Sequence, residues 1–349
     1  TAQARPQVIV FEDLHWIDQA TEEFLRLFLD SMPAARVLML LTYRPDYIYP
    51  LGQRSYQTVQ SLRPLSVEES ARMGDALLGD QSVPAELRAL IYRKSEGNPF
   101  FVEEVVKSIQ ESGALKHEGD QTLPANSFSD LLVPDTVQDA IMARIDRLGE
   151  EPKRILQLAS VVGREFASRL IDRLADLQGG TESVMRALKA KELIYEKSQF
   201  PELAYMFKHT LTQEVAYSSL LIKRRRDLHG LVGAAIEDLY ADRLGEHSEV
   251  LAYHFSRAED WTKALEYLVK SAVKATEAFA LREALRFYED ALAAARQLGD
   301  KVPVTTLMEI RGARSDLFFG VGDYSQAQTE ADERLTLSRR VGDRTGEAG

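Results

Sequence analysis

Two short runs of apolar residues lie near the start of the sequence, Val8–Phe11 and Val37–Leu41. The first is rich in β-branched residues, as expected for a strand of a parallel sheet that is covered on both faces. Between the runs, Thr21 is the expected N-cap of a helix whose apolar face is Phe24–Leu29, and Pro33 ends that helix. Strand, helix and strand within roughly 35 residues predict a βαβ unit, whose ligands lie beyond the carboxyl ends of the strands.

The pattern becomes helical from about Leu65 onwards. Ser66 is placed to cap a helix over Val67–Leu78, and Pro84 is placed to open a second helix. Pro99 suits the first turn of a third helix. The stretch 116–134 is polar, with scattered glycine and proline, and is typical of a linker or an exposed loop.

The next region combines helices with two strand-like runs. The helices are expected over Thr136–Leu148, Glu151–Ser160 and Phe166–Leu174. The runs Leu193–Glu196 and Ala204–Phe207 follow, and they predict the hairpin of a winged-helix module.

An internal repeat occupies the helical tail beyond Lys223. Ala280–Asp300 and Asp323–Asp343 align without gaps at a period of 43 residues, and helix pairs of this length stack into solenoids. The aromatic stripe of this tail is expected in the core, next to small residues such as Ala264 and Ala284, as in tetratricopeptide-like hairpins. The predicted fold is therefore mainly α with an N-terminal α/β part, divided into 1–64, 65–134, 135–222 and 223–349.

Composition narrows the class of protein and its partners. A chain of 349 residues suggests two or three domains, and the absence of cysteine excludes disulfides and thiolate metal sites. A reducing, cytoplasmic location is expected. The net charge of -11 argues against nucleic acid as a partner, and no apolar run approaches the roughly 20 residues that cross a bilayer. The basic run at 223–226 is interpreted as a solvated face, with a phosphate or partner contact as the alternative.

Candidate chemistry begins at the acidic end of the first strand. Glu12 and Asp13 stand where one carboxylate can hold Mg²⁺ and the other can orient or deprotonate a water. Two acids at a strand end can equally just begin a solvated loop. His15 and Trp16, in the continuation 14–18, are candidates for positioning the acidic loop.

At this point the sequence resembles the signal-transduction ATPases with numerous domains, and among them the ATPase regions attached to bacterial class III adenylate and guanylate cyclases. Four motifs carry the resemblance: Glu12–Asp18, Thr42–Pro45, Gly97–Glu104 and Phe207–Leu211. They occur in the family's order, and the likeness covers nearly the whole chain, most strongly over 8–220. The resemblance implies a P-loop NTPase sheet, helical and winged-helix subdomains, and tetratricopeptide-like repeats that bind a protein partner.

The resemblance also implies roles for single residues, with ATP or ADP and Mg²⁺ as cofactors. Glu12 and Asp13 correspond to the Walker B acids, in an order that leaves open which one approaches the metal. Arg44 resembles the sensor arginine that reads the terminal phosphate, although a surface arginine is the alternative. Pro99 resembles the proline that packs on adenine, which is compatible with a plain first-turn proline. His209 resembles a histidine that contacts the β-phosphate of ADP, and a purely structural histidine is the alternative.

The phosphate-binding loop Gly-x-x-x-x-Gly-Lys-Ser/Thr does not occur in the 349 residues. In the family that loop lies upstream of the acidic strand, so we expect this chain to be a fragment, and one that binds nucleotide weakly or not at all by itself. Three functions stay open: an ATPase switch that controls a nucleotide cyclase, the ATPase region of a LuxR/MalT-like transcriptional regulator, and a repeat scaffold with a decayed ATPase.

Overall fold

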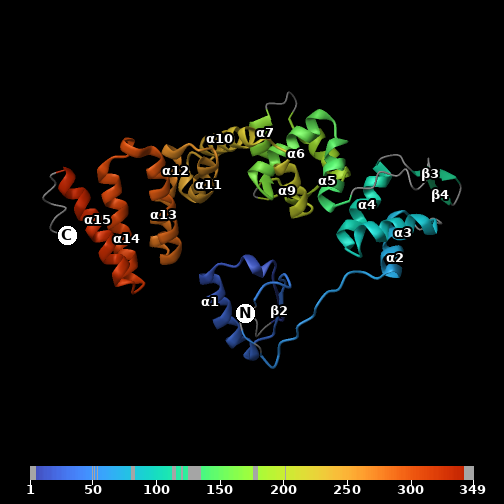
Figure 1. Cartoon of the computed structure of the whole chain (residues 1–349), viewed down its shortest axis with the longest axis horizontal. Helices are drawn as coiled ribbons and strands as arrows, with labels where there is room; N and C mark the ends of the chain where they lie inside the picture. Colours follow the sequence, from blue (N-terminus) through green and yellow to red (C-terminus); the bar gives the residue numbers. More distant parts are fainter. Residues whose placement is uncertain are drawn as a thin grey trace. The chain divides into compact units, whose positions relative to one another are not determined.

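The chain was analysed as a computed structural model, which describes residues 5–341 apart from 49, 51, 53, 80–82, 112–114, 119–120, 125–134, 176–179 and 201. The predicted mainly helical fold with a small N-terminal parallel sheet is confirmed (Figure 1). The chain divides into two compact units, Thr1–Arg63 and Pro64–Gly349. None of the described helices combines the length and the apolar character that a membrane span requires.

The first unit is the predicted βαβ unit. Strands β1 (Gln7–Phe11) and β2 (Val37–Leu41) pair in parallel, residue for residue from one end to the other. Helix α1 (Gln19–Ser31) connects them, flanked by the short 3₁₀ turns η1 (Leu14–Trp16) and η2 (Met32–Ala34). Proline in η2 marks the end of α1, as the sequence predicts.

The N-cap of α1 differs from the prediction. Asp18, not Thr21, occupies the cap, and its carboxylate accepts hydrogen bonds from the Thr21 amide (3.0 Å) and the Thr21 hydroxyl (2.6 Å). Both aspartate and threonine are good cap residues, but aspartate adds a negative charge at the positive end of the helix. The helix therefore begins two residues before Thr21.

The expectation that the first strand is covered on both faces is wrong for the described residues. On one face, the side chains pack against α1 and η1 around the buried Leu14, Leu25 and Leu29. The other face carries four apolar side chains that are about half exposed or more: Val8 (64%), Val10 (52%), Leu38 (56%) and Leu40 (47%). A single helix covers only one face of a two-stranded sheet, because alternate side chains point to opposite sides.

The second unit begins with a helical bundle of α2 (Val67–Leu77), α3 (Ala85–Ser95) and α4 (Pro99–Glu111). Ser66 and Glu69 form a reciprocal capping box at the start of α2, as the Ser66 prediction requires. The polar stretch 116–134 is not all loop: β3 (Leu115–Glu118) and β4 (Gln121–Pro124) pair as an antiparallel hairpin. Residues 125–134 of the expected linker lie outside the described residues.

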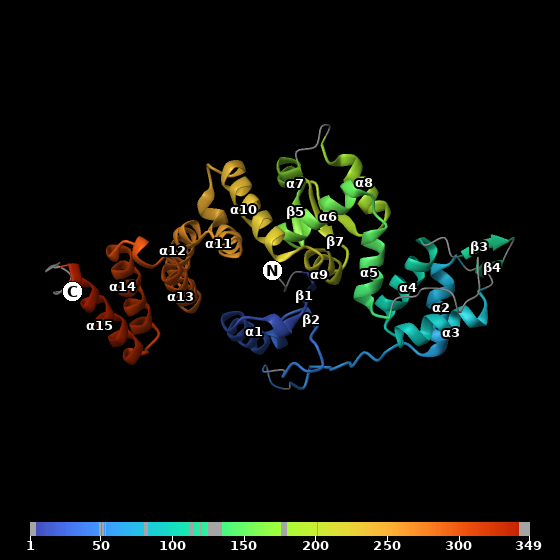
Figure 2. The same cartoon turned by 45° about the horizontal axis from the view of Figure 1, so that its top comes forward.

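A second bundle closes around a three-stranded antiparallel sheet of order β5-β7-β6 (Figure 2). Its strands are β5 (Glu165–Ala167), β6 (Ile194–Ser198) and β7 (Ala204–Phe207), and its helices are α5 (Val137–Asp146), α6 (Glu150–Val162), α7 (Ser168–Ala175), α8 (Glu182–Ala190) and α9 (Thr210–Ser218). The predicted hairpin is confirmed in β6 and β7. The helix expected from Phe166 is wrong at its start, because Phe166 is a buried strand residue that pairs with Tyr205.

The tail is a stack of helices, as predicted. It comprises α10 (Ile222–Leu239), η4 (Leu244–His247), α11 (Ser248–Arg257), α12 (Trp261–Glu277), α13 (Leu281–Leu298), η5 (Gly299–Lys301), α14 (Val304–Gly320) and α15 (Tyr324–Val341). The α14–α15 pair repeats α12–α13 with every helix boundary displaced by 43 residues, so the repeat period is confirmed.

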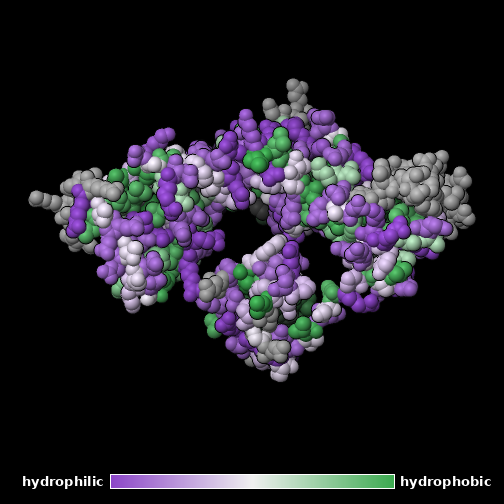
Figure 3. All heavy atoms as spheres, in the orientation of Figure 1, coloured by the Kyte–Doolittle hydropathy of each residue, from purple (hydrophilic) through white to green (hydrophobic). Residues whose placement is uncertain are grey.

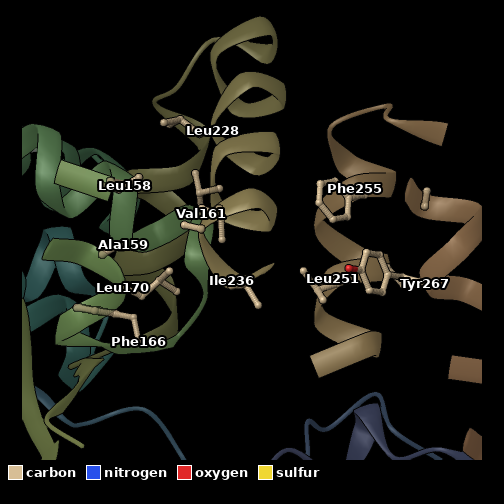
Figure 4. Close-up of a cluster of buried hydrophobic side chains, with 14 of the residues drawn as sticks. Leu158, Ala159, Val161, Phe166, Leu170, Leu228, Ile236, Leu251, Phe255 and Tyr267 are labelled. Atoms are coloured by element: carbon tan, nitrogen blue, oxygen red, sulfur yellow. The ribbon is translucent and has the colours of Figure 1, made fainter. Parts of the chain in front are cut away.

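The repeats and the preceding bundle share one continuous core. Figure 4 shows side chains of α6, such as Leu158 and Val161, pointing toward α10, and Phe255 facing Tyr267 across α11 and α12. The two rings are stacked with centroids 5.7 Å apart. Ala264 and Ala284 are fully buried where neighbouring helices approach closely, as expected from the sequence.

Candidate functional site

The acidic end of β1 is tied to the end of β2. Asp13 has left-handed backbone angles (φ 57°, ψ 45°), and its amide donates a hydrogen bond to the Thr42 hydroxyl (3.0 Å). The Leu14 amide donates to the Thr42 carbonyl at 2.8 Å. These two bonds fix the acidic turn against the neighbouring strand, so Glu12 and Asp13 lie at the carboxyl edge of the sheet with Arg44 two residues beyond Thr42.

Arg44 rests on an aromatic side chain of the acidic turn. Its guanidinium carbon lies 5.7 Å from the centre of the Trp16 ring, within the range of a cation–π contact. The His15 ring is 4.8 Å from the same tryptophan. Trp16 thus connects Arg44 to the acidic turn, and the positioning role expected for His15 stays a prediction.

The residues at this edge fit the metal-phosphate end of a bound nucleotide. Among the described residues, no hydrogen bond or ion pair engages the carboxylates of Glu12 and Asp13 or the guanidinium of Arg44. Mg²⁺ bound with a nucleotide takes one or two protein carboxylates and fills its other positions with phosphate and water. Both ring nitrogens of His15 are buried without a hydrogen-bond partner among these residues. They can therefore form further hydrogen bonds close to the acids.

In the second unit, the segment Gly97-Asn98-Pro99 joins α3 to α4 through a left-handed turn, a contact with Leu65 and a side-chain cap. Gly97 has φ +78°, and its carbonyl accepts a hydrogen bond from the Leu65 amide at 2.7 Å. The Asn98 side chain accepts from the amides of Phe100 (3.0 Å) and Phe101 (3.2 Å), which caps α4. Pro99 is the first residue of α4 and is exposed, so a first-turn role accounts for it and leaves its ring open to a ligand.

His209 lies against the residue that follows Pro99. The rings of Phe100 and His209 have centroids 4.2 Å apart, so two motifs that are over 100 residues apart in the sequence meet here. Burial lowers the pKa of His209 below its usual value, and the imidazole is neutral at pH 7. Its Nε2 atom is buried and has no hydrogen-bond partner among the described residues.

Charged residues next to these two motifs form a cluster that sequence reasoning did not single out. Lys208 donates to Glu103 and to Glu192, each at 2.7 Å, and Lys107 donates to the same two carboxylates at 2.5 Å. Hydrogen bonds from the two lysines hold the pKa of Glu192 at about 2. Glu103 and Lys208 lie inside the motifs quoted from the sequence, but only the fold shows that they pair.

A buried arginine makes a second connection between the two helical bundles. Arg144 of α5 donates from one nitrogen to both oxygens of Glu104 of α4 (2.9 and 2.7 Å), and both side chains are almost fully buried. The same guanidinium donates to the Lys191 carbonyl at 2.6 Å and pairs with Glu111. A buried charge of this kind is stable only with its partner in place, so the pair fixes how α4 sits on α5.

The structure therefore gathers the predicted site residues into two groups. Glu12, Asp13 and Arg44 lie at one sheet edge of the first unit, while the motifs of Pro99 and His209 meet in the second unit. The nucleotide-binding roles of these five residues stay predictions.

Comparisons with known proteins give the following likenesses. Residues 66–122, which include α2 to α4, match a family described as "Domain of unknown function (DUF8739)". "Uncharacterized protein R02095" of Rhizobium meliloti (strain 1021) is 25% identical over 299 residues, and the match covers 84% of this chain and 28% of that protein. A Pyrococcus horikoshii structure, described as a Signal Transduction ATPase with Numerous Domains (STAND) protein with a tetratricopeptide repeat sensor, is similar with a TM-score of 0.46 and 15% identity. That likeness covers 97% of this chain and 50% of the other, so the chain spans half or less of each of these two proteins.

Proposed function

We propose that this chain is the nucleotide-responsive part of a signal-transduction ATPase, in which the acidic edge of the first unit holds the metal-phosphate end of ATP. The observation that supports it most is the fixed turn at Asp13. It places two carboxylates that are unpaired among the described residues at the sheet edge that also carries Arg44. A loop that is merely solvated has no need of a turn that a neighbouring strand holds in place.

Each side chain at this edge has a distinct task in the proposal. Glu12 and Asp13 hold Mg²⁺ and orient a water, and Arg44 binds the terminal phosphate with two parallel hydrogen bonds. Trp16 keeps the guanidinium in place before the phosphate arrives, which reduces the entropy lost on binding. Bound Mg²⁺ supplies the positive charge that offsets the charge of the phosphates.

The second unit supplies the response in this proposal. Pro99 and His209 are the candidate contacts to adenine and to a diphosphate, and their motifs are held together by the Glu103–Lys208 ion pair. The helical repeats bind a protein partner. The output is a class III nucleotide cyclase, a choice that rests on the sequence resemblance.

Turnover of ATP by the full-length protein tests the acidic edge. We expect Glu12→Gln or Asp13→Asn to reduce kcat by at least about 100-fold, because each removes a charge that acts on the reacting phosphate. Asp30→Asn is the matched control. Asp30 lies on α1 in the same unit, and its exposed carboxylate pairs with Arg54. Unchanged turnover in both Glu12→Gln and Asp13→Asn would refute the site. Absence of ATP turnover in the unmodified full-length protein would instead favour a repeat scaffold whose ATPase has decayed.

A further inference from the structure

Phe279 has an unfavourable backbone conformation and an exposed aromatic side chain. It lies in the turn between α12 and α13 with left-handed backbone angles (φ +59°), which strain any residue with a side chain. Its ring is 87% exposed, so the strain is not offset by burial. The equivalent position 43 residues later is Gly322 (φ +85°), the residue type that suits this turn. A strained, exposed aromatic residue that the fold does not need points to binding.

Phe279 lies in a turn that adjoins a second turn with exposed apolar residues. The next equivalent turn, between α14 and α15, exposes Phe319 (66%), Val321 (41%) and Tyr324 (64%). The ring centroids of Phe319 and Tyr324 lie 5.3 Å apart. The turns adjoin, because a β-carbon placed on Gly320 would lie only 3.6 Å from Cδ1 of Leu281. We call these four residues, Phe279, Phe319, Val321 and Tyr324, the aromatic edge.

The surroundings of the aromatic edge are acidic. Four exposed carboxylates lie within about five residues of it in the sequence, against two exposed cations, Lys274 and Arg282. The carboxylates are Glu277, Glu283, Asp316 and Asp323. Figure 3 shows hydrophilic and hydrophobic residues side by side on the repeats. A partner for this surface needs apolar side chains together with positive charge.

The same chain presents that combination at the start of α10. Leu221 (80%) and Ile222 (81%) are among its most exposed aliphatic side chains, and Lys223 and Arg224 follow them. Among the described residues, no ion pair or hydrogen bond engages either of these two cations. Positive charge in the first turn is repelled by the positive end of the helix dipole. Lys223 and Arg224 therefore destabilise α10 slightly in the isolated molecule.

The next two arginines of this basic run behave differently. Arg225 donates to the Leu220 carbonyl at 2.9 Å, and Arg226 pairs with Glu259 at 2.7 Å. These two arginines have partners within the fold, although Arg226 stays exposed, as the solvated-face interpretation of the run expects. We call residues Leu221 to Arg224 the α10 start.

We propose that the aromatic edge of one copy of this chain binds the α10 start of a second copy. The two surfaces of one copy cannot meet, because the successive packing of α10, α11, α12 and α13 separates them. Each copy therefore offers one surface to each of two neighbours, which is a head-to-tail contact that builds short rows or a ring. The proposal concerns the repeats alone and does not depend on nucleotide.

Sedimentation velocity of the chain tests this contact. Concentrations between about 1 and 100 µM suit the weak association expected of a small interface. We expect the average mass to rise with concentration at low salt and to fall back toward the monomer in ~0.5 M salt, which screens the charges. Phe279→Gly weakens association at least about tenfold. Phe200→Ser is the matched control, since Phe200 is 89% exposed on the β6–β7 hairpin, away from both surfaces.

Two further readouts separate binding from folding. Phe279→Gly raises the thermal midpoint by about 1–2 °C because it relieves the turn, so weaker association cannot be ascribed to a damaged fold. Glu277→Lys and Lys223→Glu each weaken association, and the double variant restores it because the exchanged charges attract again.

A chain that stays monomeric throughout the concentration range would overturn the proposal. So would association that Phe279→Gly leaves unchanged. A labelled peptide of residues 215–230, which contains the α10 start, should bind the chain. Peptide binding that Phe279→Gly leaves unchanged would also overturn the proposal.

Discussion

Gly97 is the position where the structure makes its sharpest prediction about stability. Its backbone is left-handed (φ +78°), and a β-carbon added there would lie 2.2 Å from the Leu65 carbonyl oxygen and 3.0 Å from the Leu65 nitrogen. That nitrogen donates the hydrogen bond that Gly97 accepts at 2.7 Å. The substitution Gly97→Ala must therefore strain the backbone and also displace the segment that leads into α2.

The two effects can be estimated separately. A left-handed alanine costs about 1 kcal/mol relative to glycine. Loss of the backbone hydrogen bond adds about 1–2 kcal/mol, because the Leu65 amide loses its partner. Gly97→Ala should thus destabilise the start of α4 by about 2–3 kcal/mol. Gly79→Ala is the control: Gly79 has a similar angle (φ +89°), but nothing lies within 4 Å of an added β-carbon, so only the first cost applies.

Native-state hydrogen exchange of the helix nearest each glycine measures the difference. Exchange in α4 should accelerate by a factor of roughly 30–150 in Gly97→Ala, and exchange in α2 by only about fivefold in Gly79→Ala. Equal acceleration in the two variants would show that the contact with Leu65 does not constrain Gly97, and would refute the reasoning.

Two further predictions concern the cores of the two units. Leu25→Ala, at a fully buried position of α1, should destabilise the first unit by about 2–4 kcal/mol in urea unfolding followed by Trp16 fluorescence, while Leu27→Ala (72% exposed) should change it by less than about 0.5 kcal/mol. In the second unit, the buried His229 and His254 share a hydrogen bond (Nδ1 to Nδ1, 2.9 Å), and burial lowers their pKa values to about 4 and about 3. The unfolded chain binds these protons near pH 6.5 and the folded chain does not. This stability is therefore present above pH 6.5 and is lost, by about 3 kcal/mol for each histidine, as the pH falls toward 4. Thermal unfolding monitored by circular dichroism across this pH range should show the loss, and a flat profile between pH 7 and 4 would contradict it.

Features set by local chemistry could be predicted from the sequence. The capping box at Ser66, the first-turn Pro99 and the β6–β7 hairpin depend on residues close together in the chain. The 43-residue period is visible in the sequence because successive helix pairs pack in the same way and need the same residue types at equivalent positions. The acidic edge was also predictable, because parallel strands bring their carboxyl ends to one side of a sheet.

Features that depend on distant partners could not be predicted. β5 is only three residues long and is a strand because β7 lies beside it. The Lys208–Glu103 pair joins residues 105 positions apart, and the Phe100–His209 contact depends on the same docking. The exposed face of β1 was missed because a run of β-branched residues does not reveal how many layers cover it.

Binding of MgATP to the full-length protein and to its Arg44→Ala variant tests the central claim most directly. Trp16 lies against Arg44, so its fluorescence, observed in a Trp261→Phe background, should report binding at this edge. Loss of a two-bond contact to phosphate should weaken binding by about 10–100-fold. Arg36→Ala, a change to an exposed arginine that precedes β2 at the opposite edge of the sheet, should leave the affinity unchanged. Equal MgATP affinity in the Arg44→Ala and Arg36→Ala variants would contradict the assignment of the acidic edge as a nucleotide site.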